Sequence, residues 1–247
     1  LLFRAERKEE FNGALNEATL SFKGSRLLAN LSKLASYKYK SEDRYPFCLS
    51  PLDFIYKSNA ESIDNKYLGI IEKLNWILNS TDMEYVKQDL LEYGEQSAGN
   101  LFARNEEGIE QMKDLIEDHL KLYREKFDDN DEYFIESWPG ETYLSGWFIK
   151  IKNGGSLGAH YHHNGWISGS IYLNIPSESK VDEGAIEFGY NSDNYKEVKG
   201  TPTVSIKPEM GDIILFPSSL GHRVTPFLTN RKKEERTSIA FDLIPKI

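Results

Sequence analysis

Four of the five histidines fall in two short segments, which makes them the first candidates for chemistry. His160, His162 and His163 lie in one segment and His222 in the other. Side chains alternate between the two faces of an extended strand, so the imidazoles of His160 and His162 are expected to converge on one cation. Together with His222 they predict a three-histidine metal site on a barrel strand. The fifth histidine, His119, is expected on the surface of a helix.

The segment that follows the histidine pair alternates between polar and apolar residues. One face carries Ser168, Ser170, Tyr172 and Asn174, and the other carries Ile167, Gly169, Ile171, Leu173 and Ile175. A polar face turned toward the inside of a barrel predicts a wet pocket rather than a filled core.

A third chemical group comes from the last strand-like segment, where Arg236, Ser238 and Ala240 share a face. If that face is the interior, a guanidinium lies beside the metal. An unpaired charge inside a barrel costs several kcal/mol, so the expected partner is the carboxylate of a ligand, held by two hydrogen bonds. The alternative places Arg236 at the surface, with the charged run 231–235.

The elements that must position these residues change in type near residue 140. Before it, spacings of three to four between apolar residues predict two helices over 9–36 broken near Gly24, a short strand over 52–56, and helices over 67–78 and 109–127. After it, strands are expected over 147–152, 166–175, 185–188, 204–207, 212–216 and 236–243. Their connections are too short for crossover helices, which predicts an antiparallel barrel within an α+β fold.

We divide the chain into a helical hairpin over 1–44 and a second domain over 45–247. Within the second domain, residues 45–140 would support a catalytic β-barrel over 141–247. The hairpin resembles the end of a tetratricopeptide-type array, and an ordinary helical hairpin is the alternative.

Composition narrows the classes of function. Lys and Arg total 30 against 39 Asp and Glu, a formal net charge of −9 over 247 residues, which disfavours general binding to nucleic acid. The single cysteine, Cys48, allows no internal disulfide, as is typical of a cytoplasmic protein. We expect no membrane span and no signal peptide. Because the sequence begins at Leu1 rather than Met, we expect it to be part of a longer chain.

The order of these motifs resembles that of the 2-oxoglutarate and Fe(II)-dependent oxygenases, and within them a branch often attached to tetratricopeptide repeats. The ordered set is His160-x-His162, the segments 166–173, 184–188 and 208–222 that ends in His222, and Arg236-x-Ser238. The resemblance covers roughly residues 45 to 247 and is strongest from 145 onward.

This resemblance implies a double-stranded β-helix, the jelly-roll or cupin-like barrel, with the metal at its open end. His160 and His222 match the two histidines of the family. Arg236 matches the arginine that grips the distal carboxylate of 2-oxoglutarate, with Ser238 beside it, and Tyr172 matches a strand tyrosine that contacts the same carboxylate. The implied activity couples oxidative decarboxylation of 2-oxoglutarate to hydroxylation of a substrate, with Fe(II) as the metal and no catalytic residue beyond the metal site.

His162 departs from the family pattern, in which most relatives place Asp or Glu at this position. The departure leaves three possibilities open. These are a working three-histidine iron site, a site in which only His160 and His222 bind, and a zinc site. Arg236 discriminates among them, because a zinc hydrolase needs no clamp for a co-substrate carboxylate.

Two other classes of function remain. One is a cupin-like three-histidine isomerase, dioxygenase or hydrolase that does not use 2-oxoglutarate, and the other is an interaction protein with a vestigial barrel. Asn164, Trp166 and Trp147 lie near the metal motif and are candidates for substrate contacts. The expected partner is a small-molecule, peptide or protein substrate, with no nucleic acid and no membrane.

Overall fold

The computed structural model describes residues 2–80, 83–176, 182–191, 197–230 and 234–246. The α-helices are α1 (Lys8–Ser21), α2 (Arg26–Tyr39), α3 (Ile70–Ser80), α4 (Glu107–Lys126) and α5 (Tyr133–Glu136). Short 3₁₀ helices span Pro51–Phe54, Asn65–Tyr67 and Leu101–Ala103. The strands are β1 (Tyr56–Asn59), β2 (Tyr85–Val86), β3 (Leu91–Ser97), β4 (Thr142–His160), β5 (Ile167–Asn174), β6 (Ile186–Gly189), β7 (Val204–Ile206), β8 (Asp212–Pro217), β9 (Gly221–Val224) and β10 (Glu235–Pro245).

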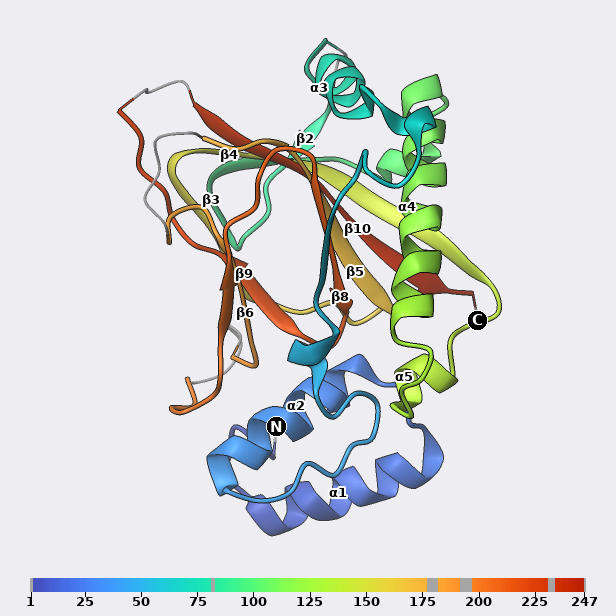
Figure 1. Ribbon diagram of the computed structural model, residues 1–247. Coiled ribbons are helices and arrows are strands. Elements are labelled where there is room, and N and C mark those ends of the chain that lie inside the picture. The colour runs from blue at the N-terminus through green and yellow to red at the C-terminus, as the bar shows by residue number, and fades with distance from the viewer. Residues whose placement is uncertain (1, 81–82, 177–181, 192–196, 231–233, 247) are drawn as a thin grey trace.

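The strands form one curled antiparallel sheet. Its order is β1-β8-β5-β10-β4-β9-β6-β7, and β3 joins it through β4 and carries β2. Figure 1 shows the sheet folding over on itself, so that β6 and β9 face the wall formed by β5, β8 and β10. The fold is therefore the α+β arrangement with a double-stranded β-helix that the sequence predicts.

Most of the predicted elements are present, but the strand over 52–56 differs, and strands β2, β3 and β9 were not predicted. The predicted strand over 52–56 is wrong, because a 3₁₀ helix occupies Pro51–Phe54 and the strand begins only at Tyr56. The ring of Pro51 at the first helical position favours this helical turn. Strand β9, which carries His222, was not among the predicted strand ranges.

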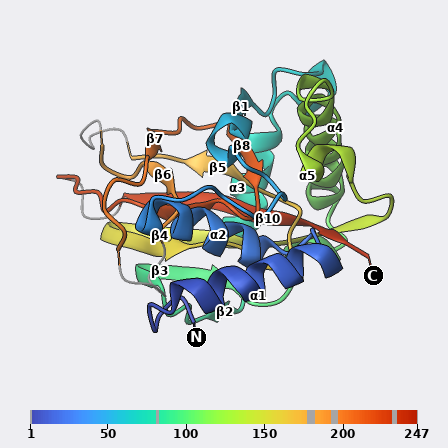
Figure 2. The ribbon, with the colours of Figure 1, turned by 90° about the horizontal axis from the view of Figure 1, so that it is seen from below.

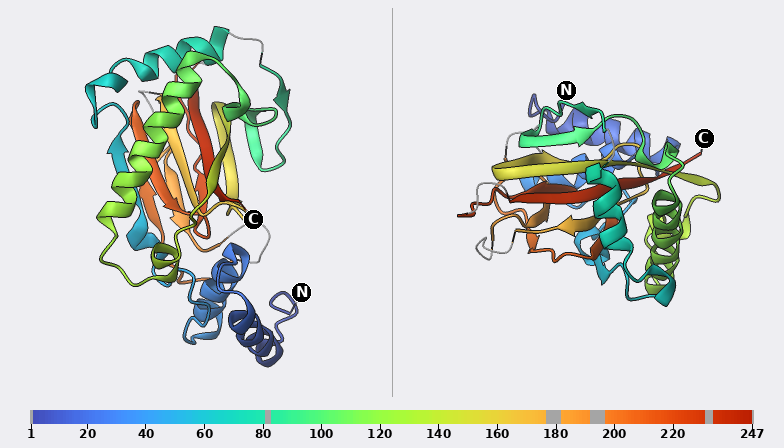
Figure 3. Two further views of the ribbon diagram at one scale, coloured as in Figure 1. Left: turned by 90° about the vertical axis from the view of Figure 1, so that its right-hand side faces the viewer. Right: turned by 90° about the horizontal axis from the view of Figure 1, so that it is seen from above.

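Helices cover the outer face of the sheet (Figure 3). On β5 the apolar residues Ile167, Ile171 and Leu173 are fully buried, and the Asn75 amide of α3 donates to the Leu173 carbonyl at 2.8 Å. The polar residues of β5 are left to the inside of the curl. One prediction fails here: His119 of α4 is fully buried, with Nε2 3.3 Å from the Ala60 carbonyl oxygen, because it lies on the inner face of its helix.

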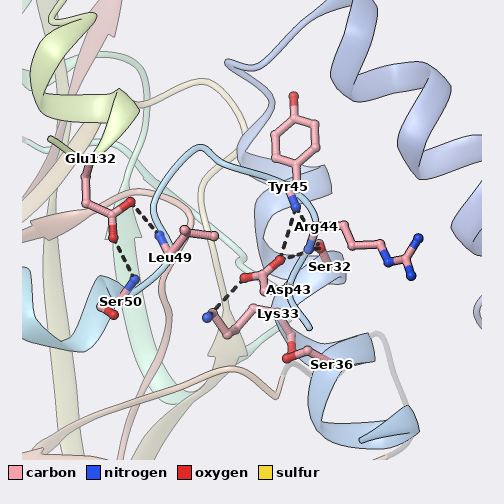
Figure 4. A network of polar contacts seen from close by, with 9 residues as sticks. All are labelled: Ser32, Lys33, Ser36, Asp43, Arg44, Tyr45, Leu49, Ser50 and Glu132. Carbon is pink, nitrogen blue, oxygen red and sulfur yellow. Dashed lines mark hydrogen bonds and ion pairs between the residues drawn. The ribbon is translucent and has the colours of Figure 1, made fainter. Parts of the chain in front are cut away.

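The hairpin α1–α2 lies across one end of the strands (Figures 1 and 2). One hydrophobic cluster runs without a break from Phe11 and Leu15 of α1 to Ile239 and Phe241 of β10. Figure 4 shows the polar side of this junction. Asp43 forms an ion pair with Lys33 at 3.0 Å, while the carboxylate of Glu132 accepts hydrogen bonds from the backbone N–H groups of residues 49 and 50.

In the part of the chain that the structure describes, none of the helices has both the length and the apolar character that crossing a membrane requires.

Candidate metal centre

The three candidate ligands come from strand β4, the loop directly after it and the neighbouring strand β9, and they converge. His160 is the last residue of β4 and lies directly opposite His222 of β9, and the backbone N–H of His162 donates to the Ser218 carbonyl at 3.0 Å. The ring centroids are 4.3 Å apart for His160 and His222, and 5.2 Å apart for each pair that includes His162. One ring nitrogen from each residue lies within 4.8 Å of the others, which is compatible with binding to a single ion.

In each of these residues Nδ1 is occupied by an acceptor. Nδ1 of His160 lies 2.8 Å from the Gly158 carbonyl oxygen, and Nδ1 of His222 lies 3.2 Å from that of Leu220. A carbonyl can only accept, so both Nδ1 atoms carry the proton and both Nε2 atoms present a lone pair. Imidazole donors of this kind suit Fe(II), Zn(II) and other divalent transition metals.

His162 differs from the other two, because its Nδ1 lies 2.6 Å from a carboxylate oxygen, Oδ1 of Asp242. The same oxygen accepts a hydrogen bond from the Ser168 hydroxyl at 2.6 Å, and that hydroxyl lies 2.8 Å from the Ser218 hydroxyl. Space for this cluster depends on Gly165, since an added Cβ there would lie 2.5 Å from the Ser218 oxygen and 3.0 Å from Asp242 Oδ1.

Sequence reasoning missed Asp242, although a signal for it was present. Alternation along β10 places Asp242 on the same face as Arg236, Ser238 and Ala240, two residues beyond the last position considered. The Asp242 side chain is buried.

The protonation states of the metal-free histidines follow from burial and from their neighbours. Burial, together with a smaller effect of the neighbouring His162, lowers the pKa of His160 to about 4. Burial also holds the pKa of His222 well below its ordinary value, with His160 and His162 adding to the effect. Burial opposes the protonated form of His162 as well, yet the charge of Asp242 and its hydrogen bond raise the pKa. His160 and His222 are therefore neutral near pH 7, as ligands must be.

Arg236 and Tyr172 form a second group deeper in the curl. Both side chains are buried, and the guanidinium carbon lies 5.0 Å from the centre of the Tyr172 ring. Burial lowers the pKa of Arg236 and raises the pKa of Tyr172. The interaction between the two side chains opposes both shifts but offsets neither of them completely.

This second group has unused capacity for hydrogen bonds. Arg236 donates through Nε to the Gly184 carbonyl at 3.1 Å, and it forms no ion pair with any carboxylate among the described residues. The Tyr172 hydroxyl is buried beside Ser170 and the Arg236 guanidinium, but neither of them lies in hydrogen-bonding geometry with it. A buried cation without a counter-ion next to an unsatisfied hydroxyl is what a site for a ligand carboxylate requires.

One cavity of about 240 Å³ connects the two groups. Its walls include the polar face of β5, with Ser168, Ser170 and Tyr172, and the inner face of β10 from Arg236 to Asp242. Ser238 and Ala240 also line it, as predicted from strand alternation. The structure therefore brings together His160, His162, His222, Tyr172, Arg236 and Ser238 around one cavity.

The three predicted substrate contacts divide into two kinds. Trp147 and Asn164 line the cavity, together with Gln88 and Gln96 from the β2–β3 hairpin. Trp166 does not line this cavity but a second pocket that shares Asn164 with it, so a contact of Trp166 with substrate stays a prediction. Its ring is 6 % exposed and its Nε1 donates to the Phe134 carbonyl at 2.8 Å, because the backbone turns the indole away from the metal end and toward the helices.

The hairpin α1–α2 contacts the backbone on both sides of the metal centre. The Arg26 guanidinium of α2 donates to the carbonyls of His163 and Asn164, at 3.1 Å each, and lies 5.7 Å from the centre of the Trp166 ring. The Asn30 amide of α2 donates to the Ser219 carbonyl at 3.1 Å. The sequence held no signal for these contacts, which join residues more than a hundred positions apart.

Comparison with known proteins agrees with this geometry. Residues 145–242 match the model of a family described as "Putative 2OG-Fe(II) oxygenase". This stretch includes all three candidate histidines, Arg236 and Asp242. A comparison with curated proteins found no match.

Solved structures share the fold at low sequence identity. A prolyl-4-hydroxylase from Pseudomonas putida matches with 13% identity and a TM-score of 0.55, over 78% of this chain and 92% of that one. A prolyl hydroxylase from Trichoplax adhaerens, in complex with a hypoxia inducible factor peptide fragment, matches with 14% identity and a TM-score of 0.54, over 79% and 85%. An oxidoreductase of the 2OG-Fe(II) oxygenase family from Burkholderia pseudomallei matches with 16% identity and a TM-score of 0.50, over 85% and 90%.

Proposed function

We propose that this chain, whose residues 145–242 match the 2OG-Fe(II) oxygenase family model, is a non-haem Fe(II) enzyme that hydroxylates an organic substrate. When bound, Fe(II) and 2-oxoglutarate supply the oxidation of the co-substrate by dioxygen to succinate and carbon dioxide, coupled to hydroxylation of the substrate. The protein's own residues bind, orient and shield these groups.

The observation that carries this proposal is the pairing of Arg236 with Tyr172. A buried guanidinium with no carboxylate among the described residues fits the distal carboxylate of 2-oxoglutarate, and the unsatisfied Tyr172 hydroxyl can donate to the same oxygen atoms. Ser238 lies on the same face of β10 and can contribute a further hydroxyl. These groups orient the co-substrate so that its keto acid end faces the histidines.

His160, His162 and His222 would hold the metal through their Nε2 atoms. The cavity walls also carry the indole of Trp147 and uncharged amides, at Gln88, Gln96 and Asn164. These groups favour a neutral substrate segment, either of a small molecule or of a peptide or protein. The net charge of −9 favours neither nucleic acid nor anionic lipid as a partner. A single cysteine, Cys48, which leaves no internal disulfide, supports the cytoplasm as the proposed location.

A second candidate is a cupin-like metalloenzyme that uses three histidines without 2-oxoglutarate. It is favoured by the candidate metal ligands found among the described residues, which are three histidines and no carboxylate. This second candidate does not explain why Arg236 is buried in the same cavity without an ion pair among the described residues.

The test is an anaerobic titration of metal-free protein with Fe(II) and then with 2-oxoglutarate, followed by the visible metal-to-ligand charge-transfer band. We expect the band in the wild type and a dissociation constant for 2-oxoglutarate about 10- to 150-fold higher in Arg236→Ala, since hydrogen bonds to charged groups contribute about 1.5–3 kcal/mol. Arg223→Ala is the matched control, because Arg223 lies next to His222 but pairs with Glu187 at 2.7 Å on the outer surface. If Fe(II) binds and no band forms at any concentration of 2-oxoglutarate, the second candidate replaces the first.

A further inference from the structure

The contact between His162 and Asp242 distinguishes this site from a ring of three equivalent histidines. His160 and His222 are each oriented by a neutral backbone carbonyl, whereas His162 is oriented by a carboxylate at 2.6 Å. The ionised Asp242 carboxylate has no proton to donate, so it can act only as a hydrogen-bond acceptor. The proton of neutral His162 therefore lies on Nδ1, and its Nε2 lone pair faces the other two rings.

We propose that Asp242 is a positioning residue of the metal centre, which fixes the metal-binding tautomer of His162 and supplies through this imidazole the negative charge that a carboxylate ligand would carry. This inference rests on the proposed function, and it concerns how the centre tolerates histidine where a carboxylate is usual. Two neutral histidines and one carboxylate ligand carry a formal charge of −1. Three neutral histidines and the Asp242 carboxylate carry the same charge, displaced outward by one imidazole ring.

The surroundings of Asp242 hold its carboxylate in place. Its Oδ1 accepts from both His162 and Ser168, and Ser168 is joined in turn to Ser218. The Ser218 carbonyl also accepts a hydrogen bond from the backbone N–H of His162. These contacts join the loop after β4, strands β5 and β10, and the turn before β9. Among the charged groups, Arg26 of α2 is close enough for its guanidinium to be stabilised by the charge of Asp242. A carboxylate held from several elements at once can set the direction of an imidazole.

Metal affinity tests the proposal directly, with Co(II) as the probe because its visible spectrum reports the ligands around it. We expect Asp242→Asn, which keeps the shape and removes the charge, to bind Co(II) about 10- to 100-fold more weakly than the wild type, the usual cost of losing such an outer partner. Asp212→Asn is the matched control. Asp212 has the same 6% exposure as Asp242, but it pairs with Lys57 and contacts none of the three histidines. We expect its Co(II) affinity and spectrum to equal those of the wild type.

Two further measurements remain informative if Asp242→Asn does not fold. Nitrogen-15 NMR of metal-free wild type at alkaline pH should show the His162 proton on Nδ1 and a bare Nε2. Ser168→Ala removes the second donor to Asp242 and should weaken Co(II) binding by a smaller factor.

If Asp242→Asn does fold, its Fe(III)/Fe(II) couple should have a higher midpoint potential than that of the wild type, since the substitution removes negative charge near the ion. A purely structural role would lower the unfolding temperature without moving this potential.

The outcomes separate this inference from the proposed function. If the wild type binds Co(II), Fe(II) and 2-oxoglutarate, and a folded Asp242→Asn has unchanged Co(II) affinity and spectrum, the inference is wrong and the proposed function stands. If the wild type binds neither metal, the proposed function is overturned. In that case a proton found on Nε2 of His162 overturns the tautomer assignment independently.

Discussion

At the scale of single residues, the Tyr172 hydroxyl makes opposite contributions to stability and to ligand binding. It is buried without a hydrogen-bond partner among the described residues, and such a group destabilises the ligand-free fold. Tyr172→Phe should therefore raise the free energy of unfolding of the ligand-free protein by about 1 kcal/mol and weaken 2-oxoglutarate binding by a similar amount, roughly fivefold. Chemical denaturation and ligand titration measure the two effects. A variant that is less stable, yet binds 2-oxoglutarate as the wild type does, contradicts the assignment.

His160 predicts how the stability of the metal-free protein depends on pH. Its pKa is about 4 in the folded protein, against an ordinary value of 6.5, because burial opposes the charged form. Between pH 6.5 and 4, His160 binds a proton in the unfolded chain but stays neutral in the folded protein. The free energy of unfolding therefore falls as the pH decreases from 6.5 toward 4. The expected loss from this residue is about 3 kcal/mol. Urea denaturation across this range, with a chelator present, should show a shallower pH dependence for His160→Gln, and equal slopes would argue against this origin.

At the scale of elements, helix α2 supports the backbone that carries the metal motif. Arg26 at its first turn donates to the carbonyls of His163 and Asn164, directly after His162. Arg26→Ala should lower the free energy of unfolding by about 1.5–3 kcal/mol, as expected for hydrogen bonds to a charged donor, and should weaken Co(II) binding. Arg7→Ala on the same hairpin is the control, since Arg7 is exposed and pairs only with the nearby Glu10, which contributes at most about 1 kcal/mol. Equal effects of the two substitutions would show that α2 does not act on the site.

Strand alternation explains how much of the site was predictable at this scale. The inward faces of β5 and β10 follow a period of two, so the positions of Ser170, Tyr172, Arg236 and Ser238 could be assigned from the sequence. The same rule reaches Asp242 within the predicted strand over 236–243, but only the structure shows that its carboxylate is buried and lies against His162.

At the scale of the whole molecule, the hairpin and the barrel share one hydrophobic cluster, from Phe11 to Phe241. Elements that bury each other's apolar surface lose stability together, so we expect a single cooperative unfolding transition. Far-ultraviolet circular dichroism follows mainly the helices, while fluorescence reports the four tryptophans, all of which lie outside residues 1–44. The two transition curves should coincide. An earlier transition in the helical signal would mean that residues 1–44 unfold as a separate domain.

The sequence by itself determined the order of elements, the two inward strand faces and the convergence of two histidines, because each depends on local periodicity. The structure alone decided what lies across from these faces. The burial of His119, the removal of Trp166 from the cavity, the contact of Arg26 with the metal loop and the pairing of His162 with Asp242 all join residues distant in sequence. Such contacts depend on the closure of the sheet and the docking of α2 onto its end, which no local pattern encodes.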